Sequence, residues 1–375
     1  MRMAQFVVAV VFLVAGRCLA SQEYSFTATL TTQERFVAVS LSTHPGHFDK
    51  EPDIPGHRLS RFSLPIANGR RMVGLLLDQD EGLLYVDLNA DGDLTNDTGS
   101  PLTASNYGPA RDQQRFGPLR LPIGSICGLD PDLVYWLSFY IVRSDKDTST
   151  ASAIPMSCHT GSVEINGKQF RFDLDDWNLD GRIDLDDMVR IRWPQAMDGD
   201  REDLAISARS ILCLSGFTCR LDLTNWPTVR LMELQQPTGR LAIKGGHIES
   251  IRLSSSEVTL LWLDPCEGPI SVPVGEYRLR DAVLAHGGKR VRAMDALYIK
   301  IAVEQGRDAE LSIGTPLRHD VQVSRSGRVL RLQHRLCGQG GETYNLLQLI
   351  PSARAPTFKV YKGDKVVGAG QFGFG

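Results

Sequence analysis

The sequence predicts a mainly β protein built from antiparallel β-sandwich domains. Over most of the chain, apolar and polar residues alternate with the period of two that half-buried strands show. Glycine, asparagine and aspartate interrupt these segments, and some segments contain their own turn, as at Asp80–Gly82 and Ile165–Gly167. Helical periodicity is confined to the short segments 184–193 and 202–210. Many short strands joined by tight turns, with few short helices, are typical of sandwiches.

The expected strands follow one another along almost the whole chain. They are rich in β-branched and aromatic residues, which favour strands, and turn-forming residues bound them. The segments with the clearest alternation are 24–30, 35–42, 71–88, 132–142, 161–174, 239–245, 248–263, 320–336 and 358–370. Within the last two segments, Ser324–Gly327 and Lys362–Asp364 predict hairpin turns.

The N-terminus predicts export. Residues 1–20 combine a basic Arg2, an apolar stretch over 6–15 and a small Ala20 at a cleavage position, as signal peptides do. The apolar stretch is shorter than the roughly 20 residues that span a bilayer, and no later segment is long and apolar enough. We therefore expect a signal peptide, no transmembrane segment, and a secreted, periplasmic or cell-envelope location.

Length and charge bound the domain organisation and the partners. The expected domains are a β-rich domain over 21–225 and a β-sandwich-like region over 226–375, with a further split near 306 as an alternative. A net charge of -3 and an isoelectric point near 6.3 show no basic excess. The composition thus predicts no nucleic-acid partner.

The cysteines suggest disulfides. Of seven cysteines, Cys18 would leave with the signal peptide, and an even number in an exported chain is typical of disulfide pairing. In the segment ILCLSGFTC, a three-residue loop over Ser215–Phe217 would place Cys213 opposite Cys219, within disulfide distance. Two small buried thiols are the alternative. The pairing among Cys127, Cys158, Cys266 and Cys337 stays open.

Two acidic loops, DLNADGDLTNDT over 87–98 and DWNLDGRIDLDD over 176–187, carry the strongest chemical signal. Each loop has carboxylate or amide side chains at its positions 1, 3 and 5, glycine at position 6 and an apolar residue at position 8. Alternate residues of a tight loop point inward and present hard oxygen ligands, and glycine permits the sharp turn. This spacing predicts that the loops bind Ca²⁺.

The two loops resemble the calcium-binding loops of EF-hands, and the second also resembles half of a dockerin repeat, in which a loop leads into a helix. The resemblance implies a first site of Asp87, Asn89, Asp91, the Asp93 carbonyl and Thr95, directly or through water. It implies a second site of Asp176, Asn178, Asp180, the Arg182 carbonyl, Asp184 and Asp187. The first loop ends in Thr98, so Asp97 or a water would have to close it.

The surroundings of the loops differ from those of EF-hands. An EF-hand has a helix before its loop, whereas GLLYV and KQFRF, which precede the two acidic loops, both predict strands. The segment SVPVGEYRL over 271–279 is similar to strands of Ig-like and prealbumin-like modules of secreted bacterial proteins. The alternative for both loops is a metal-free turn, because Asp, Asn and Gly favour turns in any case.

Two classes of function remain open from the sequence. No metalloprotease, serine-hydrolase, redox or phosphate-loop motif occurs. His44, His47 and His57 share one region with Asp49 and Asp53, which predicts either a zinc site or a polar surface loop. The first class is a calcium-binding exported β protein with a structural, envelope or adhesion role and no catalytic site. The alternative is a secreted hydrolase, for example of glycans, with paired carboxylates and structural calcium.

Overall fold

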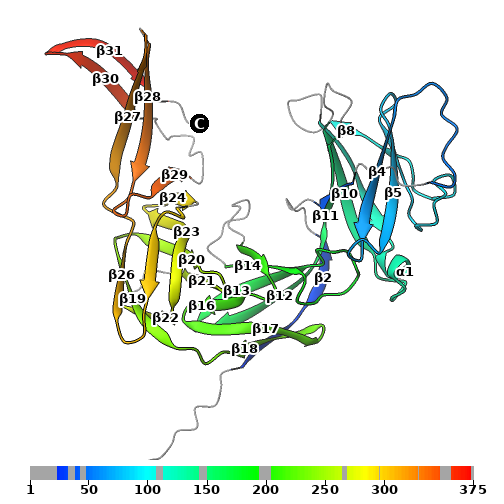
Figure 1. The fold of residues 1–375 in the computed structure, drawn as a ribbon, viewed down its shortest axis with the longest axis horizontal. Helices are drawn as coiled ribbons and strands as arrows, with labels where there is room; N and C mark the ends of the chain where they lie inside the picture. Colours follow the sequence, from blue (N-terminus) through cyan, green and yellow to red (C-terminus); the bar gives the residue numbers. More distant parts are fainter. Residues whose placement is uncertain are drawn as a thin grey trace, which may run out of the picture.

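The computed structural model describes residues 23–32, 39–42, 48–106, 113–142, 150–193, 204–263, 268–294, 296–327, 329–346 and 356–372. These residues form a mainly β protein whose sheets are largely antiparallel, with α1 as its helix (Figure 1). The fold class predicted from the sequence is confirmed. The expected signal peptide lies outside the described residues. Within the described ranges, no helix has the length and apolar character needed to cross a membrane.

The first sandwich packs two antiparallel sheets around one core. One sheet has the order β4-β5-β6-β7 and the other the order β3-β11-β10-β9-β8. Inward side chains such as Phe62, Leu75 and Phe139 fill the space between them, and α1 adds Ile126. The bounds are β3 (Val39–Ser40), β4 (Leu59–Ile66), β5 (Arg71–Asp78), β6 (Leu83–Val86), β7 (Leu102–Thr103), β8 (Ser105–Asn106), β9 (Gln113–Leu121), α1 (Ile123–Cys127), β10 (Tyr135–Val142) and β11 (Thr150–Pro155).

The second sandwich packs a five-stranded sheet, β15-β14-β13-β12-β2, against one end of a large central sheet. The central sheet has the order β1-β18-β17-β16-β21-β20-β23-β24-β29-β28-β27, and β25 pairs with β23. Phe170 and Phe172 face Leu221 and Leu231 in this core. The bounds are β1 (Tyr24–Thr27), β2 (Thr29–Thr32), β12 (Ser157–Ile165), β13 (Lys168–Asp175), β14 (Met188–Arg192), β15 (Leu204–Ser207), β16 (Ile211–Leu214), β17 (Phe217–Asn225) and β18 (Thr228–Glu233).

The third sandwich uses the opposite face of the central sheet. The sheet β22-β19-β26 covers that face, and Leu253, Tyr277 and Val272 belong to the shared core. The short apolar strand β16 is buried on both faces, since Leu212 enters the second core and Cys213 the third. The bounds are β19 (Thr238–Lys244), β20 (Ile248–Ser254), β21 (Val258–Leu263), β22 (Ile270–Pro273), β23 (Gly275–His286), β24 (Lys289–Met294), β25 (Lys300–Val303), β26 (Asp308–Ser312) and β29 (Thr343–Leu346).

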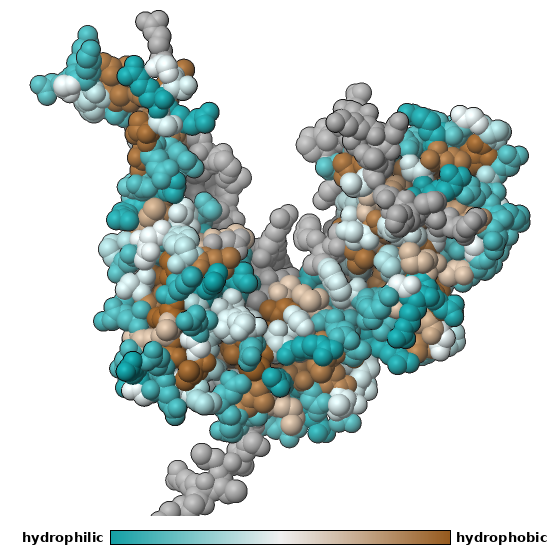
Figure 2. Space-filling view, in the orientation of Figure 1, coloured by the Kyte–Doolittle hydropathy of each residue, from teal (hydrophilic) through white to brown (hydrophobic). Residues whose placement is uncertain are grey.

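A hairpin arm extends the central sheet at its C-terminal end (Figure 1). It consists of β27 (Arg318–Ser326) and β28 (Val329–Cys337), and the separate hairpin of β30 (Thr357–Lys362) and β31 (Lys365–Gln371) lies at its far end. Val323 and Val329 of the arm are exposed, and Figure 2 shows apolar patches on the arm. A ring contact between His334 and Phe372 joins the two hairpins.

The short helices expected from the sequence are strands. Residues 188–192 form β14, and residues 204–207 form β15, which pairs with it. Val189 and Ile191 of β14 enter the second core, while Arg190 between them forms an ion pair with Asp175. The alternation of inward and outward side chains is therefore that of a strand, and the second acidic loop does not lead into a helix as in a dockerin.

The chain crosses residue 225 within one sheet. β17 and β18 lie on either side of this position and pair with each other in the central sheet. The segment TNWPT therefore forms the turn of a hairpin, with a cis bond between Trp226 and Pro227.

The expected disulfide between Cys213 and Cys219 is absent, and the described cysteines are all free thiols. The turn contains two residues, Ser215 and Gly216, both with positive φ, as in a type I′ hairpin, so Leu214 pairs with Phe217. This shifts the register by one residue from the expected three-residue loop. Because a shift of one residue reverses the face, Cys213 and Cys219 lie in different cores. Cys266 lies outside the described residues.

Both thiols are expected to stay reduced and unreactive in the folded protein. Cys213 and Cys219 are fully buried, and burial raises the pKa of both thiols, so little thiolate forms. Peptide mapping of alkylated, non-reduced protein should show modification of both cysteines only after unfolding, whereas the partly exposed Cys127 reacts earlier. A peptide linking Cys213 to Cys219 would contradict this register.

Candidate calcium-binding loops

The first acidic loop joins β6 to β7 at one end of the first sandwich. Strand β6 ends at Val86, and Asp87 follows with its side chain almost fully buried. Asp87 accepts hydrogen bonds from the backbone N–H groups of Asp91 (3.1 Å) and Gly92 (3.0 Å). The Asn89 side-chain oxygen also accepts from the Asp91 N–H, at 3.0 Å. Position 1 of the loop thus holds together the turn that contains positions 3, 5 and 6.

The second acidic loop joins β13 to β14 and repeats this pattern. Asp176 accepts from the backbone N–H groups of Asp180 (3.0 Å) and Gly181 (2.6 Å). The Asn178 side-chain oxygen accepts from the same Asp180 N–H, at 2.9 Å. Asp180 in turn accepts from the N–H of Arg182, at 2.9 Å. The bond from Asp93 N–H to Asp91 is its counterpart in the first loop, at 2.8 Å.

The two loops also share their backbone conformation. Position 4 has positive φ in both loops, 56° at Ala90 and 54° at Leu179, although neither residue is glycine. Position 6 has positive φ as well, 84° at Gly92 and 78° at Gly181. Non-glycine residues with positive φ are uncommon, and their recurrence at the same position indicates that the two sequences specify one loop structure.

The closing residues of the two loops are equivalent despite the difference in sequence. Asp187 at position 12 accepts from the N–H of Trp177 at position 2, at 2.9 Å. In the first loop, Asp97 at position 11 accepts from the N–H of Leu88 at position 2, also at 2.9 Å. Asp97 thus takes the place of Asp187 in the hydrogen bonding. Its second oxygen is buried and has no hydrogen-bond partner among the described residues.

The second loop lies between two hydrophobic cores. Leu179 is part of the first core, whereas Ile183, at position 8, is part of the second. The Tyr135 hydroxyl of β10 donates to Asp176 at 2.9 Å, and the Ala67 N–H donates to the Asn178 carbonyl at 2.9 Å. Both partners belong to the first sandwich. The second loop therefore connects the first and second sandwiches, whereas the first loop packs Leu88 and Ala90 against the first core.

Burial raises the pKa of the carboxyl groups that close the second loop. The pKa of Asp176 rises to about 7, chiefly because it is buried and also because the Asp187 charge is close. The pKa of Asp187 rises to about 7 as well, chiefly through burial and then through its acidic neighbours. In the first loop, burial raises the pKa of Asp87 and Asp97. Buried carboxylates that repel one another favour a bound cation.

The remaining predicted ligands lie at the surface of the loops. The Thr95 hydroxyl donates to the Asp93 carboxylate, and the Lys50 ammonium lies 3.0 Å from the same carboxylate. Arg182 and Asp184 are exposed. Within the described ranges, no three His, Cys, Asp or Glu side chains converge closely enough to hold a metal ion. The carboxylates accept backbone N–H bonds instead, so cation binding would require some of them to rotate inward.

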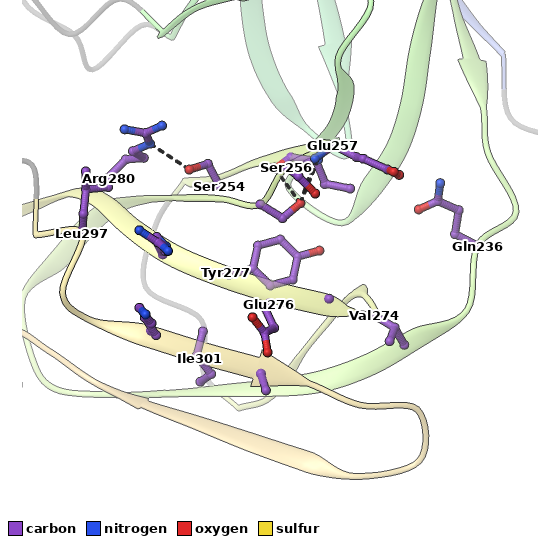
Figure 3. Close-up of a pocket in the computed structure, with 16 residues that line it drawn as sticks. Gln236, Ser254, Ser256, Glu257, Val274, Glu276, Tyr277, Arg280, Leu297 and Ile301 are labelled. Carbon is purple, nitrogen blue, oxygen red and sulfur yellow. Dashed lines mark hydrogen bonds between the residues drawn. The ribbon is translucent and has the colours of Figure 1, made fainter.

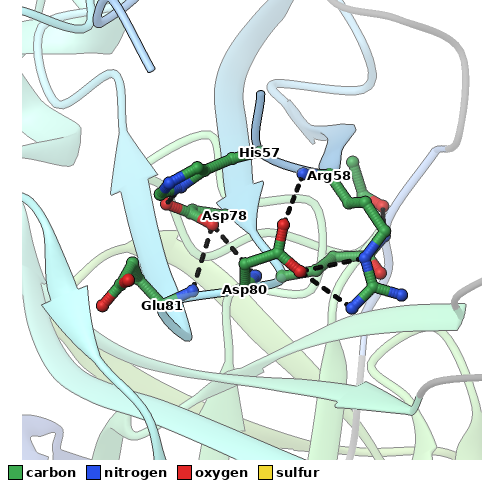
Figure 4. A network of polar contacts seen from close by, with 7 residues as sticks. His57, Arg58, Asp78, Asp80 and Glu81 are labelled. Carbon is green, nitrogen blue, oxygen red and sulfur yellow. Dashed lines mark hydrogen bonds and ion pairs between the residues drawn. The ribbon is translucent and has the colours of Figure 1, made fainter. Parts of the chain in front are cut away.

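The histidine region predicted as a zinc site or a polar loop gives a different arrangement. His44 and His47 lie outside the described residues. His57 lies 2.7 Å from the buried Asp78, which also accepts from the N–H groups of Asp80 and Glu81 (Figure 4). Asp80 forms an ion pair with Arg58. These contacts fasten the start of β4 to the turn after β5.

The His57–Asp78 pair gives stability a defined pH dependence. The hydrogen bond to Asp78 raises the His57 pKa. Burial raises the Asp78 pKa, but hydrogen bonds from His57 and from backbone N–H groups outweigh this effect and lower the pKa overall. The contribution of His57 to the stability of the fold is therefore complete below pH 6.5 and is lost as the pH rises through its raised pKa. The contribution of Asp78 is complete above pH 3.8 and is lost as the pH falls through its lowered pKa. In denaturant melts, His57→Gln should remove the loss that occurs as the pH rises through the raised His57 pKa, and an unchanged profile would contradict the pairing.

Sequence reasoning missed several contacts of the loops. Asn96 donates to Asp91, Lys50 pairs with Asp93, and Tyr135 donates to Asp176. Asn96 lies within the first loop and could have been included from its amide alone. Lys50 and Tyr135 are distant in the chain, and no local pattern connects them to the loops.

The comparisons with known proteins find no matching family model, no similar curated protein and no similar solved structure.

Proposed function

We propose that the protein is an exported, calcium-binding β protein with a structural role in the cell envelope or in adhesion. The observation that carries this proposal is the repetition of one acidic loop structure at two places in the chain. Both loops have the same positive φ at positions 4 and 6 and the same bonds from position 1 to positions 5 and 6. Their donors are carboxylate, amide and carbonyl oxygens, which are the ligands that Ca²⁺ prefers.

The position of the second loop supports a structural role for the ion. Leu179 and Ile183 bury the loop in two cores, and Tyr135 binds its first carboxylate. An ion bound by Asp176 and Asp187 would neutralise two buried charges at the junction of two sandwiches. Calcium at this place would fasten the first sandwich to the second, and calcium at the first loop would stabilise the first sandwich alone.

The test is a calorimetric titration of the chelator-stripped protein with calcium. We expect up to two saturable binding events, with the tighter one removed by Asp180→Ala, because the second loop has a closing carboxylate at position 12. Magnesium serves as the control, since it requires a smaller and more rigid octahedral site. The absence of binding heat at millimolar calcium, with unchanged thermal unfolding, would refute the proposal. Loss of the tighter event in Asp91→Ala instead would show that the first loop is the stronger site.

The hydrolase alternative has one observation in its favour. A pocket remote from both acidic loops is lined by Glu257 and Glu276, which are the kind of carboxylate pair that glycan hydrolysis uses. Both side chains are exposed, whereas the general acid of such enzymes is held in an apolar environment. The pocket therefore supports ligand binding better than proton transfer. Release of reducing sugar from glycans, abolished by Glu276→Gln, would favour the enzyme.

A further inference from the structure

A surface pocket of the third sandwich lies over β20, β23 and β25 (Figure 3). Its volume is about 760 Å³, within the range of about 300–1,000 Å³ found for small-molecule sites. Figure 3 shows Arg280 and Leu297 at one end, and Glu257, Gln236 and Val274 toward the other. Neither acidic loop contributes a residue to this pocket, so its ligand is independent of calcium binding at the loops.

One end of the pocket contains three cationic side chains. Arg278 of β23 pairs directly with Lys300 of β25 in the antiparallel register, so the two side chains leave the same face of the sheet. Like charges directly opposite each other destabilise a sheet. Within the described ranges, neither side chain forms an ion pair with a carboxylate. The fold thus contains an unbalanced positive pair that an anion would stabilise.

A β-bulge adds the third cation. The register between β20 and β23 shifts next to Arg280, and such bulges re-aim a side chain. The Arg280 guanidinium donates to the Ser254 hydroxyl at 2.7 Å, which fixes its direction at the edge of the pocket. Ser254 is itself the register partner of Arg278 on β20. Guanidinium groups in a fixed orientation are suited to carboxylate and sulfate oxygens.

The other end of the pocket offers acceptors. Glu257 and the Gln236 amide present oxygens there, and Val274 provides apolar surface, while Glu276 lies between the two ends. A bare inorganic anion would use the cationic end alone, and the carboxylates would repel a second negative group. A ligand with one anionic group and several hydroxyls fits both ends, because hydroxyls donate to carboxylates.

We propose that this pocket binds an acidic saccharide, with its carboxylate or sulfate group at Arg278, Arg280 and Lys300 and its hydroxyls toward Glu257 and Glu276. The ligand is one or two sugar units long, as the pocket volume permits. Calcium binding at the acidic loops is not required for this inference, and its failure would leave the pocket intact.

The test is calorimetric titration of the intact protein with four probes: glucuronate, glucose 6-sulfate, glucose and inorganic sulfate. We expect at least one of the two charged sugars to bind at least tenfold more tightly than glucose and inorganic sulfate. Whether glucuronate or glucose 6-sulfate binds more tightly then identifies the anionic group as a carboxylate or a sulfate. Arg278→Gln and Lys300→Gln should each weaken that binding about tenfold. Arg240→Gln, which removes an exposed arginine of β19 outside the pocket, is the matched control and should leave it unchanged.

Three results would overturn the proposal. The first is that neither charged sugar shows saturable binding at 10 mM probe. The second is that glucose or inorganic sulfate binds as tightly as the charged sugars. The third is that Arg240→Gln weakens binding as much as Arg278→Gln and Lys300→Gln do. Loss of fold does not confuse the outcome, because Lys300→Gln removes one of two opposed like charges and should keep or raise the melting temperature.

Discussion

Asp187→Asn is expected to abolish most of the calcium-dependent stabilisation that we propose for the protein. An ion that binds the folded state alone stabilises it by about 2.7 kcal/mol when its free concentration is a hundredfold above the dissociation constant. Asp187 closes the second loop, is almost fully buried and receives the Trp177 and Asp184 N–H groups. Asparagine removes the negative charge and one acceptor oxygen, so the calcium-dependent part should fall by about 2 kcal/mol or more.

The measurement is chemical unfolding in chelator and in millimolar calcium, for the wild type and for two variants. Asp186→Asn is the matched control, because Asp186 is adjacent but exposed and pairs with Arg209 instead. It should keep the full calcium response. An equal response in Asp187→Asn and the wild type would show that the second loop does not hold the stabilising ion.

Asp281→Ala is expected to destabilise the third sandwich by about 3–5 kcal/mol, as the loss of one member of a buried ion pair does. Asp281 of β23 is buried and accepts from Arg292 of β24 at 3.0 Å. Arg252 of β20 lies 2.5 Å from the same oxygen. Alanine would leave two largely buried guanidinium groups without this carboxylate, at the centre of three adjacent strands.

A matched control for Asp281→Ala lies on the same sandwich. Arg240 and Asp308 form an exposed pair between β19 and β26, and exposed pairs contribute about 0–1 kcal/mol. Asp308→Ala should therefore shift the unfolding midpoint only slightly. If the two variants have equal midpoints, the buried arginines find other partners, and the central carboxylate does not organise these strands.

The sequence predicted the strands and the likeness of the two acidic loops better than it predicted register. Alternation identified strand segments because side chains on opposite faces of a sheet meet different environments. The spacing of Asp, Asn and Gly predicted two similar loops, and the equal φ at Ala90 and Leu179 bears out that similarity. The calcium ion itself stays a prediction, because a loop structure can form through its own N–H bonds.

The incorrect predictions share one physical cause, which is that distant partners decide them. Residues 188–192 follow an acidic loop as a dockerin helix does, but Asp175 on the neighbouring strand binds Arg190 and Ile191 enters a core. The Cys213–Cys219 prediction depended on the number of residues in a turn. Two residues and three both suit a hairpin, and they place the second cysteine on opposite faces.

The double burial of β16 has a consequence for how the molecule melts. In β16, Leu212 and Leu214 pack in the second core, while Ile211 and Cys213 pack in the third. In β21, Leu261 packs in the second core and Leu260 in the third. Neither core can open along these strands without exposing apolar side chains of the other. We therefore expect the second and third sandwiches to melt as one cooperative unit, and the first, with a core of its own, to melt separately.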